Sequence, residues 1–341
     1  MRRRGNKRNG LAAVSLAVLC ALFLGTAAAD AAACRQLVPV GHTVGIKLFS
    51  EGVLVVGLSE IKNETGSRAP AKECGLQVGD VILSADGDEI QSTEHFQTVV
   101  AESKGEELDL TVRREGEVLA LCAKGMKGTD GTVRLGAWVR DSLAGIGTMT
   151  FYDPESGQFG ALGHGINDTD TQVLMPMAEG AIMYSTVKAV KPGEAGNPGE
   201  LRGNFDLKRD LGTLRANTAH GVFGTVAAED FPWEQNPVAV AAPEEVKCGK
   251  AEILSNISGD SVESYQIEIR RICGQNKDGR DFVIEVTDKR LLDATGGFVQ
   301  GMSGSPIVQN GKLVGAVTHV LVNSPDTGYG IFIENMLDAA G

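Results

Sequence analysis

The sequence lacks the spacings of cysteine and histidine that hold metal ions. Its six cysteines include no Cys-x-x-Cys pair, and its five histidines include no His-Glu-x-x-His motif. After one apolar stretch near the amino terminus, no second segment reaches membrane-spanning length, which excludes an intramembrane metalloprotease. We therefore expect no metal site and no cofactor.

The chain also has too little positive charge to suit a nucleic acid. Its net charge is −12, and the first 33 residues contribute five basic side chains against one acidic, or +4, so the remainder carries −12 − 4 = −16. Such an acidic body repels phosphate backbones. We expect no nucleic-acid partner.

The amino terminus has the three parts of an export signal. A basic cluster precedes an apolar stretch at residues 11–24, and small residues follow at 27–33. This pattern predicts a signal peptide or a single membrane anchor over residues 1–33, and hence an exported protein. Whether the signal is removed stays open.

Export would permit disulfides. Cys248 and Cys273 lie at the outer ends of two strand-like runs that are joined by Ser258-Gly259-Asp260. A hairpin of near-symmetric register would bring the two sulfur atoms together. We state this pairing as a hypothesis.

The length of 341 residues favours two domains, and the 44 glycines favour short elements joined by many turns. Residues 42–127 read as a small α+β module. Its run Ala71–Leu83, with Gly75 and Gly79-Asp80, resembles the signature of a PDZ domain. Residues 125–131 are glycine-rich and polar, as in a linker.

The PDZ resemblance implies a site for an extended peptide. The peptide would lie as an added strand beside Val53, Leu54, Val55 and Val56 and the helix of Glu94–Glu102. The preceding loop contains Glu51, which would repel a terminal carboxylate. We therefore expect the ligand to be an internal segment or an intramolecular strand; a purely structural module that binds nothing is the alternative.

Residues 130–341 form the second predicted domain. Short apolar runs alternate with turn signals such as Asp153-Pro154 and Asn310-Gly311, which favours barrels or a sandwich. Two six-stranded barrels would fit this length.

The sharpest local signal lies at residues 296–308. A nucleophilic serine needs a tight turn that exposes its hydroxyl and aims backbone N–H groups at one point, and glycines surround Ser303. The segment resembles the nucleophile segment of chymotrypsin-like proteases, Gly-Asp-Ser-Gly-Gly-Pro. That resemblance implies an oxyanion hole made by the N–H groups of Gly301 and Ser303. Ser305 is the rival nucleophile, although Pro306 disfavours it, and a plain hairpin turn is the bland alternative.

A serine nucleophile needs a histidine base. His42 and His95 fall at the PDZ module, which leaves His164, His220 and His319. The glycines on both sides of His164 allow a substrate to approach closely, so the residues favour His164, with His220 next.

The motifs together resemble a narrower family. A PDZ module, then Ala144–Glu155, Gly160–His164 and Gln300–Ile307 look like the stage IV sporulation protein B peptidase of spore-forming Firmicutes. The resemblance implies a mainly β fold, namely a chymotrypsin-like double β-barrel preceded by a PDZ domain and an N-terminal signal or anchor helix. It assigns Ser303 and His164 as catalytic and Asp288 as the acidic partner. On the residues alone, four other aspartates compete for the last role: Asp168, Asp170, Asp206 and Asp293.

The same resemblance implies the biology. These serine endopeptidases are exported into the space between forespore and mother cell, where they cleave a membrane-bound regulator of an intramembrane protease, and they cleave themselves. Three alternatives remain: a carboxy-terminal processing peptidase with a lysine base, a high-temperature-requirement type protease, and a secreted binding scaffold on a protease fold.

Overall fold

The computed structural model describes residues 35–274 and 279–341, with only the backbone at residues 207 and 208. The predicted signal or anchor segment, residues 1–33, lies outside the described residues. Among the residues that the structure describes, no helix is both long and apolar enough to cross a membrane.

The first barrel is closed by six strands in the order β2, β11, β12, β15, β14, β13 and back to β2, all antiparallel. Its core contains buried Met149, Phe159 and Ile182. A short β1 pairs with the end of β11. The bounds are β1 (Gln36–Pro39), β2 (Thr43–Leu58), β11 (Ala137–Tyr152), β12 (Gln158–Ala161), β13 (Glu179–Lys191), β14 (Glu200–Thr218) and β15 (Gly221–Thr225).

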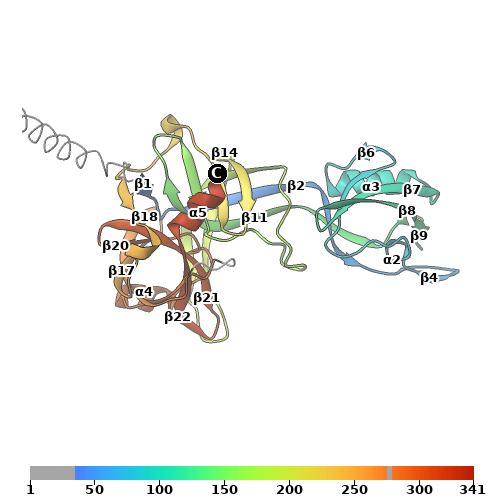
Figure 1. The fold of residues 1–341 in the computed structure, drawn as a ribbon. Helices are drawn as coiled ribbons and strands as arrows, with labels where there is room; N and C mark the ends of the chain where they lie inside the picture. Colours follow the sequence, from blue (N-terminus) through green and yellow to red (C-terminus); the bar gives the residue numbers. More distant parts are fainter. Residues whose placement is uncertain (1–34, 275–278) are drawn as a thin grey trace, which may run out of the picture. The chain divides into compact units, whose positions relative to one another are not determined.

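The second barrel closes in the order β17, β18, β19, β22, β21, β20 and back to β17, and β16 adds to β21 in parallel. Figure 1 shows its strands circling a common axis. Its elements are β16 (Val238–Val240), β17 (Gly249–Ser258), β18 (Ser261–Ile272), β19 (Phe282–Val286), β20 (Pro306–Gln309), β21 (Lys312–Leu321) and β22 (Ser324–Phe332), with α4 (Lys289–Thr295), α5 (Ile333–Ala340) and the short helices η1 (Ala228–Asp230) and η2 (Pro243–Glu245).

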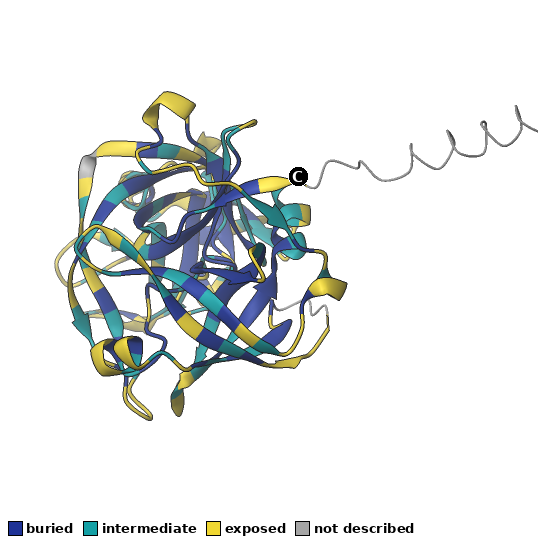
Figure 2. Cartoon of the chain, turned by 90° about the vertical axis from the view of Figure 1, so that its left-hand side faces the viewer, coloured by how far each residue is buried: buried dark blue, intermediate teal, exposed yellow. Residues whose placement is uncertain are grey.

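Strand alternation explains both barrels. In β19, Phe282, Ile284 and Val286 are buried while the residues between them are partly exposed, the period of two that places one face inside a barrel. Figure 2 shows the same alternation as dark blue interrupted by teal and yellow along the strands. The predicted double β-barrel is confirmed, and closure leaves few strand edges unpaired.

The PDZ module surrounds a core of its own that includes Phe96, Val100 and Leu110. Helix α3 begins where the sequence predicts, because the Ser92 hydroxyl accepts the N–H of His95 at 3.1 Å. The elements are β3 (Ile61–Asn63), β4 (Gly66–Arg68), α2 (Pro70–Glu73), β5 (Val81–Ala85), β6 (Asp88–Glu89), α3 (Thr93–Glu102), β7 (Glu107–Arg114), β8 (Glu117–Lys124), β9 (Met126–Lys127) and β10 (Val133–Arg134).

The structure differs from the predicted division at residues 42–127 and 130–341. The first half of β2, residues 43–49, is a strand of the first barrel, pairing with both β11 and β13. The second half, from Val53, pairs with β5 of the PDZ module. The PDZ module is therefore inserted between two neighbouring strands of the barrel. The residues Ser50-Glu51-Gly52 are typical of a loop, and the sequence therefore does not predict that one strand continues from the barrel into the PDZ module.

The predicted Cys248–Cys273 disulfide is not formed. The hairpin exists, but Gly249 pairs with Ile269, so the register places Cys248 opposite Arg270, three residues short of Cys273. Both cysteines are free and exposed. Three residues of strand amount to about 10 Å, beyond the reach of a disulfide.

The packing of His42 predicts that the stability of the fold depends on pH. The ring of His42 stacks on Trp233 with centroids 4.3 Å apart, and burial lowers its pKa to about 4, although Asp260 acts in the opposite direction. His42 therefore binds a proton more tightly in the unfolded chain than in the folded one. Stability should fall as the pH drops from about 6.5 towards 4, by less than about 3 kcal/mol because the ring is partly exposed. Urea unfolding at pH 7.5 and 5.0 measures this loss, which His42→Phe should diminish. An equal loss in the variant would contradict it.

Candidate active site

The nucleophile segment lies at the entrance of the second barrel, between α4 and β20. Gly301 and Gly304 have φ of 98° and 95°, left-handed values that glycine adopts without strain. A Cβ on Gly304 would lie 2.0 Å from the Thr148 carbonyl oxygen and 2.5 Å from the Leu162 nitrogen. The turn that presents Ser303 thus needs glycine at position 304 both for its dihedral angles and for space.

Thr148, on β11 of the first barrel, holds this turn. Its N–H donates to the Ser303 carbonyl at 2.9 Å, and its hydroxyl donates to the Gly301 carbonyl at 2.7 Å. Thr148 is fully buried. These two hydrogen bonds fix the Gly301–Met302 and Ser303–Gly304 peptide planes against the other barrel.

The two amides predicted for the oxyanion hole are not used elsewhere. Met302 N–H donates to Val299 at 3.1 Å, and Gly304 N–H donates to Val317 at 2.7 Å. Within the described ranges, the N–H groups of Gly301 and Ser303 have no protein acceptor. Both N–H groups are therefore available as donors, and the oxyanion hole stays a prediction.

His164 lies on the loop between β12 and β13, directly after Leu162 and Gly163. Both preceding residues have left-handed φ angles, 70° and 69°. For leucine this conformation is strained, a feature that clusters at functional sites. The strained turn directs the chain from the barrel strand into the cavity that His164 lines.

The protonation state of His164 suits a base. Its Nδ1 lies 2.8 Å from the Gly165 carbonyl oxygen, which can only accept, so Nδ1 carries the proton and Nε2 keeps its lone pair. Burial lowers the pKa of His164, and the Gly165 carbonyl offsets this in part. The imidazole is therefore neutral at pH 7.

Ser303 and His164 line one cavity of about 480 Å³, together with Gly301 and His319. The rings of His164 and His319 lie with centroids 5.4 Å apart. The Ser303 hydroxyl donates to the Thr318 carbonyl at 2.8 Å, so it must turn away from Thr318 to reach an imidazole. The remaining walls are mainly apolar and include Ile146, Leu162, Phe298 and Val299.

Asp288 does not join this group. It caps the amino terminus of α4, where its oxygens accept N–H groups of Arg290 at 2.9 Å and Gln266 at 3.2 Å. Arg290 holds the pKa of this carboxyl below its ordinary value. Asp288 does not line the cavity, and the Gly165 carbonyl binds the imidazole nitrogen that an aspartate would orient. A catalytic role for Asp288 stays a prediction from the family resemblance.

The competing residues are placed elsewhere or differently. Asp168 and Asp170 both pair with Arg140. His220, Asp206, Asp293 and Ser305 do not line the cavity. The Ser305 hydroxyl is buried against Ser255 at 3.2 Å. Sequence reasoning missed Thr148 and Thr318; Thr148 lies inside the run Ala144–Glu155, which carried the family resemblance.

The predicted peptide-binding residues lie beside a strand of the same chain. The first part of β11 pairs antiparallel with β2, with Val139 opposite Val55 and Arg140 opposite Leu54. Leu135 is buried in the PDZ core with Phe96 and Val100 of α3, and Val139 packs against that core. The Asp141 carboxylate accepts the N–H of Thr93 at 2.8 Å. β11 thus pairs with the edge of β2 beside which the sequence predicts a peptide ligand.

A serine and a neutral histidine in one cavity, on two closed barrels with a PDZ module, define a serine peptidase of the chymotrypsin fold. The family described as SpoIVB peptidase S55 matches residues 131–337, and a PDZ domain family matches residues 66–114. Because the first match covers more than half of the chain, this protein belongs to the SpoIVB peptidase S55 family and is a serine peptidase.

Other relatives match in part. Two zinc metalloproteases named RasP are 36% identical over 75 residues (Shouchella clausii, 20% of this chain and 18% of the relative) and 38% identical over 60 residues (Oceanobacillus iheyensis, 18% and 13%). The chain therefore spans less than a fifth of the length of these curated relatives.

Solved structures also match in part. The active form of the Rv3671c protease from M. tuberculosis matches at 17% identity and a TM-score of 0.33, covering 58% of this chain and 75% of that one. The PDZ domain of the SdrC-like protein from Listeria monocytogenes matches at 21% identity and a TM-score of 0.22, covering 26% and 87%.

The hydrogen bonds from Thr148 to the nucleophile turn predict what removal of the Thr148 hydroxyl does to activity. Thr148→Val keeps the shape of the side chain but leaves the Gly301 carbonyl unpaired, at a cost of about 1–2 kcal/mol. With the oxyanion amides less well fixed, turnover should fall about tenfold or more. Labelling of Ser303 by a fluorophosphonate probe measures this rate, and urea unfolding measures stability.

Thr150→Val is the matched control. Thr150 is two residues further along β11, and its buried hydroxyl has no partner among the described residues. This variant should keep both the labelling rate and the stability. Equal labelling rates for the two valine variants would contradict the role of Thr148.

Proposed function

We propose that this serine peptidase is an exported endopeptidase that acts in sporulation signalling. It cleaves a membrane-associated regulatory protein, and itself, in the space between forespore and mother cell. The family match to SpoIVB peptidases supports this role, and the export-type amino terminus supports the location. The observation that carries the chemistry is the neutral, Nδ1-protonated His164 in one cavity with Ser303.

In the proposed reaction each of these groups has one step. The Ser303 hydroxyl leaves the Thr318 carbonyl and attacks the peptide carbonyl carbon, while His164 Nε2 takes the hydroxyl proton. The N–H groups of Gly301 and Ser303 stabilise the oxyanion. The imidazolium then gives its proton to the leaving amine, which leaves an acyl-enzyme on Ser303. Water, activated by the same imidazole, releases the acid and restores the serine.

Apolar side chains around the cavity suit an apolar substrate residue next to the cleaved bond. Ile146, Phe298 and Val299 supply these contacts. An endopeptidase needs a site that accepts an extended segment, and we propose that this cavity is that site. Regulatory proteins anchored in a membrane offer such segments in their linkers.

Ser303→Ala and His164→Ala should both abolish self-cleavage of the protein that begins after Ala33. The fluorophosphonate probe should label the wild type, label His164→Ala at least 100-fold more slowly, and leave Ser303→Ala unlabelled. Full activity of His164→Ala would favour a lysine base. A wild type that is not labelled and does not cleave itself would favour a non-catalytic binding scaffold. The hydrogen bond from the Ser303 hydroxyl to the Thr318 carbonyl is the observation that favours this alternative.

The lowered pKa of His164 predicts the pH profile. The neutral imidazole is the active base, and burial lowers its pKa, so the midpoint of the labelling profile should lie below pH 6.5. Labelling rates between pH 4.5 and 8 test this. A midpoint at pH 6.5 or above would argue against the buried, neutral base.

We further propose that the PDZ module takes its own chain, residues 133–141, as an intramolecular ligand. The support is the pairing of Val139 with Val55 and the burial of Leu135 in the PDZ core. A labelled peptide of residues 133–141 should bind the Leu135→Ala/Val139→Ala variant, whose own strand has lost its apolar anchors, and should not bind the wild type. A scrambled peptide is the control. Equal binding to both folded proteins would count against this ligand.

A further inference from the structure

The loop that carries His164, residues 162–178, connects β12 to β13 without a strand of its own. Its position therefore depends on the backbone bond from the Ala178 N–H to the Phe49 carbonyl at its end, 2.9 Å, and on side chains that reach it from elsewhere. On one side, Asn217 of β14 accepts the N–H of Ile166 at 2.8 Å and donates to the carbonyls of Ile166 and Met175, each at 3.0 Å. This anchor comes from the first barrel.

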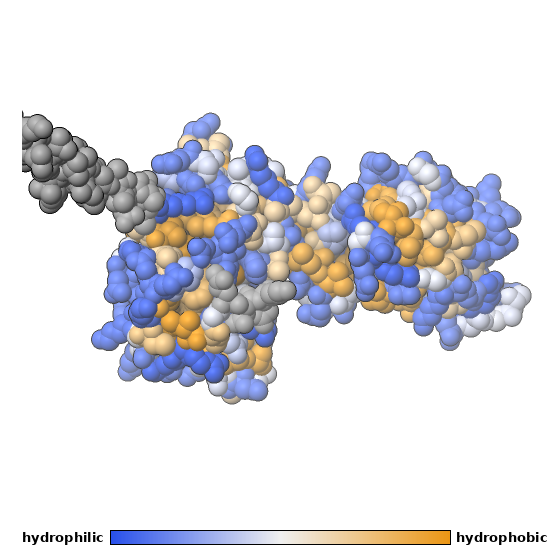
Figure 3. Space-filling model, in the orientation of Figure 1, coloured by the Kyte–Doolittle hydropathy of each residue, from blue (hydrophilic) through white to orange (hydrophobic). Residues whose placement is uncertain are grey.

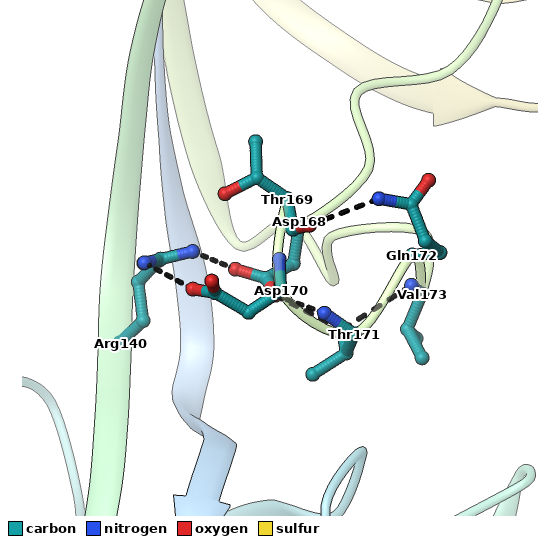
Figure 4. Close-up of polar contacts among 7 residues, drawn as sticks. All are labelled: Arg140, Asp168, Thr169, Asp170, Thr171, Gln172 and Val173. Carbon is teal, nitrogen blue, oxygen red and sulfur yellow. Dashed lines mark hydrogen bonds and ion pairs between the residues drawn. The ribbon is translucent and has the colours of Figure 1, made fainter.

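The second anchor is a carboxylate. Asp168 is fully buried, and its Oδ1 accepts the N–H groups of Asp170 at 3.0 Å and Thr171 at 2.8 Å and the Thr171 hydroxyl at 3.0 Å. These bonds make a compact turn four residues after His164 (Figure 4). Burial favours the neutral acid, but the bonds from Thr171 and the charge of Arg140 keep the pKa of Asp168 below its ordinary value. A buried carboxylate of this kind needs a cation.

Arg140 supplies that cation. Its guanidinium pairs with Oδ2 of Asp168 through one nitrogen and with Asp170 through the other at 2.9 Å, as Figure 4 shows. One planar fork thus spans two carboxylates of one turn, a geometry that lysine cannot reproduce. The side chain is mostly shielded, with 28% exposed, so the pair is screened less than a surface salt bridge.

Arg140 belongs to the part of β11 that lies against the PDZ module. It stands opposite Leu54 and follows Val139, which packs against the PDZ core. Apolar contacts also join the loop to the PDZ module. Met175 of the loop is buried with Leu54 and Val81, and Ile166 packs against them. The loop is therefore fixed by the same strand that fills the PDZ groove.

We propose that Arg140 is a positioning residue for His164. By holding Asp168 and Asp170, it ties the loop of the catalytic histidine to the strand seated between β2 and α3, so the occupant of the PDZ groove controls the geometry of the base. This rests on the proposed function of Ser303 and His164. A peptide that displaced residues 133–141 from the groove would withdraw Arg140 and release the loop.

The test compares three arginine substitutions in the full chain. Arg140→Gln should slow fluorophosphonate labelling of Ser303 at least tenfold, and Arg140→Lys should recover part of the loss. Arg270→Gln is the matched control, because Arg270 also pairs with two carboxylates, those of Glu268 and Glu285, but lies on β18 and does not line the cavity, so this variant should label at the wild-type rate. Thermal unfolding establishes that each variant is folded.

A pH profile separates positioning from general weakening. If the loop opens, the His164 ring becomes hydrated, so the midpoint of labelling in Arg140→Gln should move up towards 6.5. A merely structural loss would lower the rate without moving the midpoint. Asp170→Asn, which removes the exposed partner alone, should give the same upward direction with a smaller effect and serves if Arg140→Gln does not fold.

Two outcomes would overturn the proposal. The first is a folded Arg140→Gln, or a folded Asp170→Asn in its place, that labels within twofold of the wild type with an unchanged midpoint. The second is an Arg270→Gln variant as slow as Arg140→Gln. If the wild type itself is not labelled, the proposed peptidase site fails, which is a different result from either of these.

Discussion

The attachment of the nucleophile turn to the other barrel is the constraint on which the site depends. Thr148 belongs to the first barrel, and it binds the carbonyls of Gly301 and Ser303 in the second. The glycine at 304 lets the two barrels approach so closely that no Cβ fits between them. Because the histidine follows a neighbouring strand of the first barrel, this contact sets the distance between base and nucleophile.

The sequence was informative wherever one short segment determines its own geometry. The glycines around Ser303, the Ser92 cap and the alternating strands all act locally, so the turn, the helix start and the barrels could be predicted. Contacts between distant segments were not predictable in this way. Nothing near Arg140 indicates that it meets Asp168, and nothing near Thr318 indicates that its carbonyl accepts the bond from Ser303.

Asp288 illustrates the limit of a local pattern. An aspartate two residues before an arginine and just ahead of a helix is typical of an N-cap, and that is where the structure places it. The family resemblance adds a role that this position does not carry by itself. Conversely, the Gly165 carbonyl fixes the tautomer of His164, and no side-chain motif in the sequence predicts this contact.

The surface around the PDZ module is also unusual in composition. Trp138 and Val118 are among the most exposed large apolar side chains, at 66% and 64%. Figure 3 shows apolar areas interrupted by hydrophilic ones on the face in view. Since Trp138 lies on β11 between Ala137 and Val139, one face of that strand packs partly against the PDZ core while the other meets solvent.

The insertion of the PDZ module into a strand pair has a mechanical consequence. A domain joined by one linker can swing freely, whereas this one is joined by two paired strands, β2 and β11, that continue into the barrel wall with a register shift between Arg140 and Ser142. Any rotation of the module must twist that ribbon. The orientation of the PDZ module is therefore coupled to the conformation of β2 and β11 in the catalytic barrel.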